Sequence, residues 1–110
     1  MDTAAHRSGP LVQLRSLGGA INDVAADDTA YAHRHQQGLA IVSQFPPDDG
    51  GQLDDAWRSV ETYADGAYRS FESRPDSRTF RLAFPGATGD RVLDLRNRFD
   101  PDGVFRRLEE

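Results

Sequence analysis

The sequence predicts an α+β domain, in which an antiparallel sheet has two main helices packed on one face. Segments 11–17 and 39–45 have the apolar content of strands, and segments 53–64 and 90–99 repeat apolar residues at helical spacing. Along the chain the order is strands, helix, one or two further strands, helix and tail. That order is typical of the α+β class.

Both strands are bounded by residues that interrupt a sheet. Segment 11–17, "LVQLRSL", ends at a pair of glycines. In segment 39–45, Leu39, Ile41 and Phe45 point to one face, and two prolines follow directly. Each segment is therefore expected to form one strand of the sheet.

The first helix has the clearest pattern in the chain. Leu53, Trp57, Val60 and Ala64 recur at helical spacing, and Gly66 is expected to end the helix. Two aspartates lie in its first turn, where the helix dipole favours negative charge. The expected core consists of six apolar residues from the strands and the two helices: Leu39, Ile41, Trp57, Val60, Leu95 and Phe99.

One or two further strands are expected between the helices, where two segments are candidates. "AYRSFES" occupies residues 67–73, and "TFRLAF" occupies residues 79–84. The second prediction rests on the alternation of Phe80, Leu82 and Phe84. A proline and a glycine end that segment.

The last helix, 90–99, leads into the stretch "RFDPDGVF". Because proline disfavours the α conformation in the residue before it, the helix is expected to close by Asp100. Residues 100–103, "DPDG", fit a type I turn. Val104 and Phe105 are then expected to anchor the tail on an apolar surface.

Length and composition fit one small domain. The chain has 110 residues, within the roughly 50–250 residues of folded domains. Residues 1–10 are expected to be a flexible lead-in and residues 11–110 a single domain, with "PPDDGG" at 46–51 as an internal loop. Only 37% of the residues are hydrophobic, which suits a domain that leans on a partner or pairs with itself.

Charge and residue types exclude several classes of function. The net charge is −5 and the 13 arginines are scattered, whereas nucleic-acid binding requires a basic stripe. The absence of cysteine excludes disulfides, thiol catalysis and cysteine–zinc sites. With no long apolar run and no signal-peptide pattern in the first ten residues, the protein is expected to be cytoplasmic, with no membrane partner.

Few residues have the spacing of a catalytic or metal site. His33 and His35 would share a face of an extended segment, but no third ligand is apparent, so no metal is expected and polar edge positions are favoured. Three pairs of aspartates are neighbours in sequence, which rarely converge across a pocket as acid–base catalysis requires. Tyr31, Tyr63 and Tyr68 could each line a pocket, although packing at the core edge is favoured for each.

Four stretches in a fixed order resemble a known family: "LGGAINDVAADDTAYAHR", the helix with Trp57, "GAYRSFES" and "DRVLDLRNRFDPDGVFRR". Over residues 11–107 the chain resembles the C-terminal (berberine-like) domain of berberine-bridge-enzyme-like FAD-linked oxidases, of the vanillyl-alcohol-oxidase flavoprotein class. The last stretch is the most specific, because it matches a basic helix, an aromatic residue, Asp-Pro and an apolar-Phe tail. Its matching residues are Leu95, Arg98, Phe99, Asp100, Pro101, Val104 and Phe105. The resemblance implies a helix near 79–84, where alternation predicts a strand, and both expectations stay open.

The resemblance implies that the chain is the substrate-side domain of an FAD-dependent oxidoreductase. It implies that Tyr68 is catalytic and faces the substrate, and that His33, Arg34 and Ser70 bind the substrate or support its pocket. Ser70 stands where the family commonly has asparagine, so a hydroxyl replaces an amide. The family's FAD-binding domain has no counterpart here, so the resemblance assigns no cofactor-binding residue. FAD would come from a separate or missing flavoprotein domain, and the chain is not expected to be redox-active alone.

Two other functions stay open beside this one. The chain could be a repurposed stand-alone small-molecule-binding protein or cofactor-free enzyme. It would then be a homodimer, whose interface covers the surface that docks on the FAD domain in the family. It could also be an inactive remnant that keeps only the fold.

Overall fold

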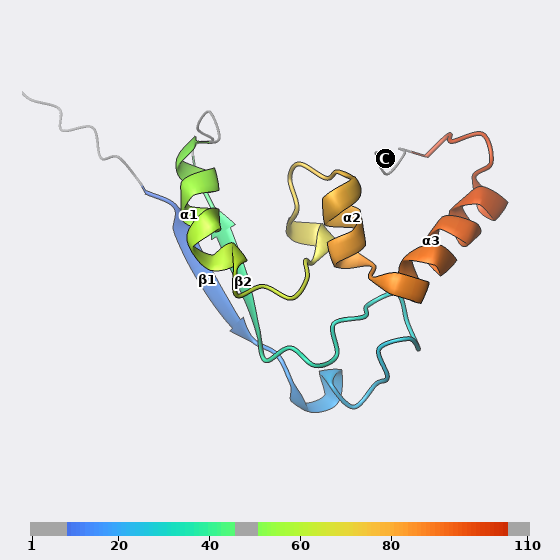
Figure 1. Cartoon of the computed structure of the whole chain (residues 1–110), viewed down its shortest axis with the longest axis horizontal. Coiled ribbons are helices and arrows are strands. Elements are labelled where there is room, and N and C mark those ends of the chain that lie inside the picture. The colour runs from blue at the N-terminus through green and yellow to red at the C-terminus, as the bar shows by residue number, and fades with distance from the viewer. Residues whose placement is uncertain (1–8, 46–50, 106–110) are drawn as a thin grey trace, which may run out of the picture. The chain divides into compact units, whose positions relative to one another are not determined.

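The computed structural model describes residues 9–45 and 51–105. The chain divides into two compact units, the first reaching to Ser16 and including Gly38–Ala64, and the second containing Leu17–Gln37 and the chain from Asp65 onward. The predicted lead-in and the predicted "PPDDGG" loop fall almost entirely outside the described residues. The elements in chain order are β1 Leu11–Ser16, η1 Gly19–Ile21, β2 Gly38–Ser43, α1 Gly51–Glu61, η2 Arg69–Phe71, α2 Ser77–Ala83 and α3 Gly86–Phe99 (Figure 1).

The predicted α+β class is confirmed. In the described residues, two antiparallel strands form one sheet and the chain has three α-helices. None of the helices in this part of the chain is both long enough and apolar enough to cross a membrane.

The sheet of the first unit is an antiparallel pair of strands, and all six residues of β1 are exposed. β1 pairs with β2 from Leu11 opposite Ser43 to Ser16 opposite Gly38, so both predicted strands are confirmed to within two residues. Ile41 is buried in this sheet at 7% exposure. Leu14, which points to the opposite face because side chains alternate along a strand, is 80% exposed.

Helix α1 packs against β2 and confirms the predicted first helix (Figure 1). Leu53, Trp57 and Val60 are half-buried and follow one side of the helix, as their spacing predicts. With Ile41 of β2 they form the apolar centre of the first unit. The helix ends at Glu61, earlier than predicted.

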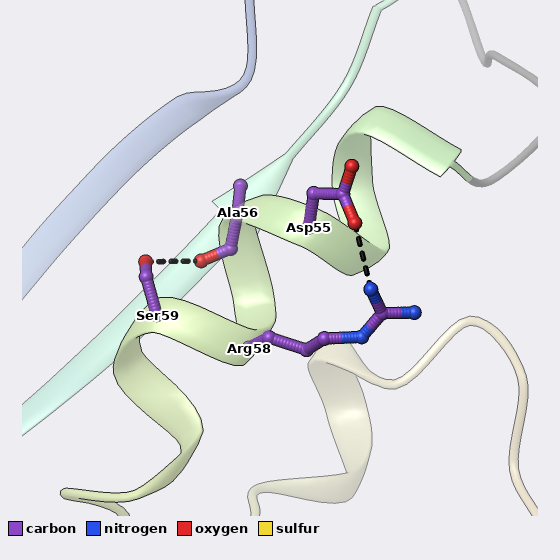
Figure 2. Close-up of polar contacts among 4 residues, drawn as sticks. All are labelled: Asp55, Ala56, Arg58 and Ser59. Atoms are coloured by element: carbon purple, nitrogen blue, oxygen red, sulfur yellow. Dashed lines mark hydrogen bonds and ion pairs between the residues drawn. The ribbon is translucent and has the colours of Figure 1, made fainter.

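The outer side of α1 carries polar contacts within the helix (Figure 2). The Arg58 guanidinium lies 2.8 Å from the Asp55 carboxylate, and both side chains are largely exposed. The Ser59 hydroxyl donates a hydrogen bond of 2.7 Å to the Ala56 carbonyl oxygen. Exposed ion pairs of this kind contribute about 0–1 kcal/mol, so the stability of α1 depends on its apolar side.

A helix replaces the strand predicted at residues 79–84. Helix α2 begins after Asp76, whose carboxylate accepts a hydrogen bond of 2.7 Å from the Thr79 amide, while the Thr79 hydroxyl accepts one from the Asp76 amide. This reciprocal cap stabilises the first turn. Phe80, Leu82 and Phe84 occupy alternate positions, but Phe80 and Phe84 are also one helical turn apart, and their ring centroids lie 5.2 Å from each other. The strand prediction was therefore wrong.

The strand predicted at residues 67–73 is also wrong. The segment forms the short 3₁₀ helix η2, Arg69–Phe71. At the start of the segment, the Ala67 amide donates a hydrogen bond of 3.1 Å to the carbonyl oxygen of Leu82 in α2. This amide therefore does not pair with another strand.

Helix α3 confirms the last predicted helix, but its buried side differs from the prediction. Gly89 is buried, and a Cβ atom there would lie only 2.4 Å from the carbonyl oxygen of Phe84. Leu95 and Phe99 are 46% and 71% exposed, so their assignment to the core was wrong. The spacing of the large apolar residues misled the prediction, since small residues make the close contact.

The predicted turn after α3 is present and holds the tail in a defined conformation. The Gly103 amide donates a hydrogen bond of 3.1 Å to the Asp100 carbonyl oxygen. The Asp100 carboxylate accepts hydrogen bonds from the amides of Val104 at 2.7 Å and Phe105 at 3.1 Å. The Val104 and Phe105 side chains are 79% and 75% exposed.

Acidification is expected to loosen the start of α2. The backbone hydrogen bond from Thr79 lowers the pKa of Asp76 below its ordinary value of 3.8. The charged carboxylate therefore stabilises the helix above that value, and the stabilisation is lost as the pH falls through the folded-state pKa. An NMR titration should show the Asp76 carboxyl and the Thr79 amide changing together at low pH. Asp76→Asn should keep the cap without this titration, and an Asp76 pKa at or above 3.8 would contradict the prediction.

Candidate functional site

A pocket of about 200 Å³ lies within the second unit. Three segments that are distant in sequence form it: the loop that precedes β2, the stretch that enters η2, and the end of α2. Its lining residues are Ala30, Tyr31, His33, Ala67, Tyr68, Arg69, Ala83 and Phe84. The wall is mostly apolar, with a few polar groups, as is common in small-molecule sites.

Edge-to-face ring contacts connect two of these segments. The Tyr31 ring lies 5.7 Å from the His33 ring and 5.8 Å from the Tyr68 ring, centroid to centroid, at interplanar angles of 83° and 89°. The Tyr68 ring also contacts Phe71 at 5.4 Å. Such contacts stabilise aromatic pairs beyond the area they bury, so they fix the two segments against each other.

His33 is the buried polar residue of the pocket. It is only 8% exposed, and its ring lies on Gly66 so closely that a Cβ atom at residue 66 would be 2.2 Å from His33 Cε1. Its Nε2 atom is buried and has no hydrogen-bond partner among the residues that the structure describes. Buried polar groups are nearly always hydrogen-bonded, so an unpaired imidazole nitrogen beside a pocket indicates a place where a ligand can bind.

Arg34 does not line the pocket, but it holds one of the segments that form it. Its guanidinium donates hydrogen bonds to the carbonyl oxygens of Tyr31 at 3.0 Å and Ile21 at 2.9 Å, and to the Thr29 hydroxyl at 2.9 Å. It also lies over the Tyr31 ring, 4.9 Å from the centroid. These contacts hold the loop that carries Tyr31 in place.

The four site residues implied by the resemblance have different positions. Tyr68, 41% exposed, and His33 both line the pocket. Arg34 contacts the Tyr31 segment and does not line the pocket. Ser70 is exposed on η2 and is not part of the lining. The structure thus brings Tyr68 and His33 together, with Arg34 behind them.

Several pocket residues were not predicted from the sequence. Tyr31 was favoured as a core-edge residue, although its position two residues before His33 placed it in the same stretch. Phe84 was hidden by the wrong strand prediction. Gly66 does not line the pocket but lies against the His33 ring, and it was expected only to end a helix. By contrast Tyr63, the third tyrosine, is 87% exposed.

The second histidine of the sequence pair lies elsewhere. His35 is exposed and is not part of the pocket lining, although it is only two residues from His33. Across residues 9–45 and 51–105, no three His, Cys, Asp or Glu side chains are grouped so that they could hold a metal ion.

The described residues do not fit a whole FAD molecule. Pockets for drug-sized ligands measure roughly 300–1,000 Å³, and FAD is larger than such ligands. The pocket of about 200 Å³ can take only a single-ring group. The pocket therefore has room for a small molecule and is too small for the whole cofactor.

The comparisons with known proteins identify no relative. No protein-family model matches the chain, and neither a curated protein nor a solved structure matches it.

Proposed function

We propose that this chain supplies the substrate side of a flavin-dependent oxidoreductase, with the substrate held in the pocket beside Tyr31, His33 and Tyr68. One observation carries the proposal. The stretches "AYAHR" and "GAYRS", where the resemblance to berberine-bridge-like oxidases implies site residues, are far apart in sequence but line one pocket. A remnant that kept the family's fold without its function would not need to bring these side chains together.

Two features of the second unit agree with the resemblance. Helix α2 lies where the resemblance implies a helix. The Asp-Pro turn after α3 presents Val104 and Phe105 to the outside, as a tail that packs on another domain would.

In this proposal Tyr68 is the residue that contacts the reacting part of the substrate. Its phenol can donate or accept a hydrogen bond, and its ring belongs to the pocket wall. Arg34 positions the loop of Tyr31 and His33. Ser70 has no role in the pocket.

The isolated chain is expected to bind no FAD with useful affinity. The pocket is too small for the cofactor, and the resemblance assigns none of these 110 residues to the FAD pyrophosphate. Titration of FAD with the purified chain, followed by flavin fluorescence, should show no saturable change. Quenching at micromolar FAD would contradict the prediction. Ser70→Asn, which restores the residue common in the family, should not create binding.

Purification of the tagged chain from its native host tests the proposed function. We expect a flavoprotein to co-purify in a fixed ratio, recognised by the flavin absorption spectrum of the complex. Tyr68→Phe should keep the complex and lower its turnover of substrate, because the phenol is lost while the ring remains. Recovery of the chain from its native host without any flavin would overturn the proposal.

A stand-alone small-molecule-binding protein is the second candidate. It is favoured by the location of the pocket, since the eight described residues that line it all belong to the second unit. The same purification separates the two candidates, because a stand-alone protein would bind a small molecule without any flavoprotein.

For the stand-alone candidate, we propose that a second copy of the chain covers the exposed apolar end of the second unit, making a homodimer. Phe99, Val104 and Phe105 are 71–79% exposed there, and exposed apolar clusters are uncommon on soluble monomers. Light scattering should show a dimer for the parent chain and a folded monomer for Phe105→Asp. Tyr63→Asp, at an exposed tyrosine of the first unit, should remain a dimer. A parent chain that is monomeric at high micromolar concentration would contradict self-association and favour a flavoprotein as the cover.

A further inference from the structure

We infer that the pocket binds a small aromatic carboxylate, whose ring lies against the apolar wall and whose carboxylate is held by Arg69 and His33. The inference rests on the proposed function, since it names the substrate class of the same pocket. It is carried by the size of the pocket, by the chemistry of its wall, and by nitrogen atoms of Arg69 and His33 that have no hydrogen-bond partner among the described residues.

Pocket size restricts the ligand to one ring. A cavity of roughly 150 Å³ lined by apolar side chains can hold benzene, so a pocket of about 200 Å³ has room for a ring with one small substituent. Three alanines and the rings of Tyr31, Tyr68 and Phe84 supply the apolar surface. Aromatic rings prefer edge-to-face or offset contacts with such neighbours, which favours an aromatic ring over an aliphatic chain.

The polar groups of the pocket select an anion. Arg69 lines the pocket, and within the described part of the chain no hydrogen bond or ion pair of its guanidinium is found. The Nε2 atom of His33 is buried without a partner. Among the residues that the structure describes, no acidic side chain lines the pocket. Arginine gives a carboxylate two parallel hydrogen bonds, whereas a cationic ligand would be repelled by it.

Two acidic side chains, Glu72 and Asp76, line a small hollow together with Arg69. The Glu72 carboxylate accepts a hydrogen bond of 2.8 Å from the Arg74 amide, and the Asp76 carboxylate accepts one of 2.7 Å from the Thr79 amide. Neither carboxylate forms an ion pair with Arg69 among the described residues, so the guanidinium is available to a ligand at the pocket.

An NMR titration of the full chain with benzoate tests the inference, with benzamide as the neutral compound of the same shape and acetate as the carboxylate without a ring. Benzoate should shift the ring signals of Tyr31, His33 and Tyr68, and benzamide and acetate should bind at least about tenfold more weakly. The His33 ring nitrogens should shift with benzoate, and this readout needs no variant.

Two variants that each remove one positive charge then show which side chain binds the carboxylate. Arg69→Gln should weaken benzoate binding by about tenfold or more and leave benzamide binding unchanged. Arg81→Gln, on the exposed side of α2 and away from the pocket, should bind benzoate like the parent. His33→Phe keeps a ring without hydrogen-bonding groups, and if it does not fold, His33→Gln replaces it; either should weaken benzoate binding.

Three results would overturn the inference: equal affinity for benzoate and benzamide, equal behaviour of Arg69→Gln and Arg81→Gln, or no shift of the pocket signals with benzoate. If benzamide binds as tightly as benzoate at the same residues, the ligand is not required to be a carboxylate. The proposed function would be unaffected by that result. Failure of the proposed function is recognised separately, by the absence of flavin from the complex purified from the native host.

Discussion

Gly66→Ala is expected to unfold or displace the His33 segment and to abolish ligand binding in the pocket. The new methyl group would lie 2.2 Å from His33 Cε1 and 2.7 Å from Nδ1, far inside van der Waals contact. His33 is buried and cannot move aside without breaking its contact with Tyr31. Overpacking of this kind costs about 1–3 kcal/mol, which is a large share of the stability of a small domain. Urea unfolding followed by circular dichroism measures the loss.

Two further variants make the cause of the Gly66→Ala effect specific. Gly9→Ala should be neutral, because a Cβ atom at Gly9 would meet no atom within 4 Å. The double variant Gly66→Ala with His33→Ala should recover part of the stability lost by Gly66→Ala, since removal of the ring relieves the clash. Unchanged stability and unchanged His33 signals in Gly66→Ala would show that the ring does not lie on residue 66.

Trp57→Ala is expected to cost about 3 kcal/mol, the lower end of the range for deleting a large aromatic side chain from a core. Trp57 is half-buried on the side of α1 that packs against β2, and it is the only tryptophan of the chain. The loss should appear in the unfolding of the first unit, measured by circular dichroism because the fluorescence probe is removed. A loss below about 1 kcal/mol would place Trp57 at a surface or interface instead.

Arg58→Ala is the matched control for Trp57→Ala on the same helix. It removes a long side chain from the outer side of α1, together with the exposed ion pair to Asp55 (Figure 2). The expected change is below about 1 kcal/mol. If Arg58→Ala were as destabilising as Trp57→Ala, the apolar side of α1 would not be what holds the helix on the sheet.

Local patterns were sufficient to predict most elements of the fold. The strands and α1 follow from alternation and helical spacing, because each buries one side against a neighbour. The wrong strand prediction at α2 has a physical cause. Residues 80 and 84 fit both an alternating and a helical pattern, and the reciprocal cap of Asp76 and Thr79 stabilises the helix. Alternation in a short segment could not reveal that cap.

The candidate site could be predicted only in part. His33 and Tyr68 were expected there through the resemblance, and both line the pocket. The role of Arg34 as a support depends on carbonyl groups that only the folded loop brings to it. The contact between His33 and Gly66 joins residues far apart in sequence, and no local pattern announces it.

Contacts between aromatic side chains test most directly whether "AYAHR" and "GAYRS" form one pocket. In a uniformly labelled sample, nuclear Overhauser effects are expected between the rings of Tyr31 and Tyr68, and between the His33 ring and Gly66. Cross-strand effects between β1 and β2 serve as the internal control for a folded sample. Detection of both contacts is the predicted result. Their absence from a sample that shows the β1–β2 effects would contradict the pocket.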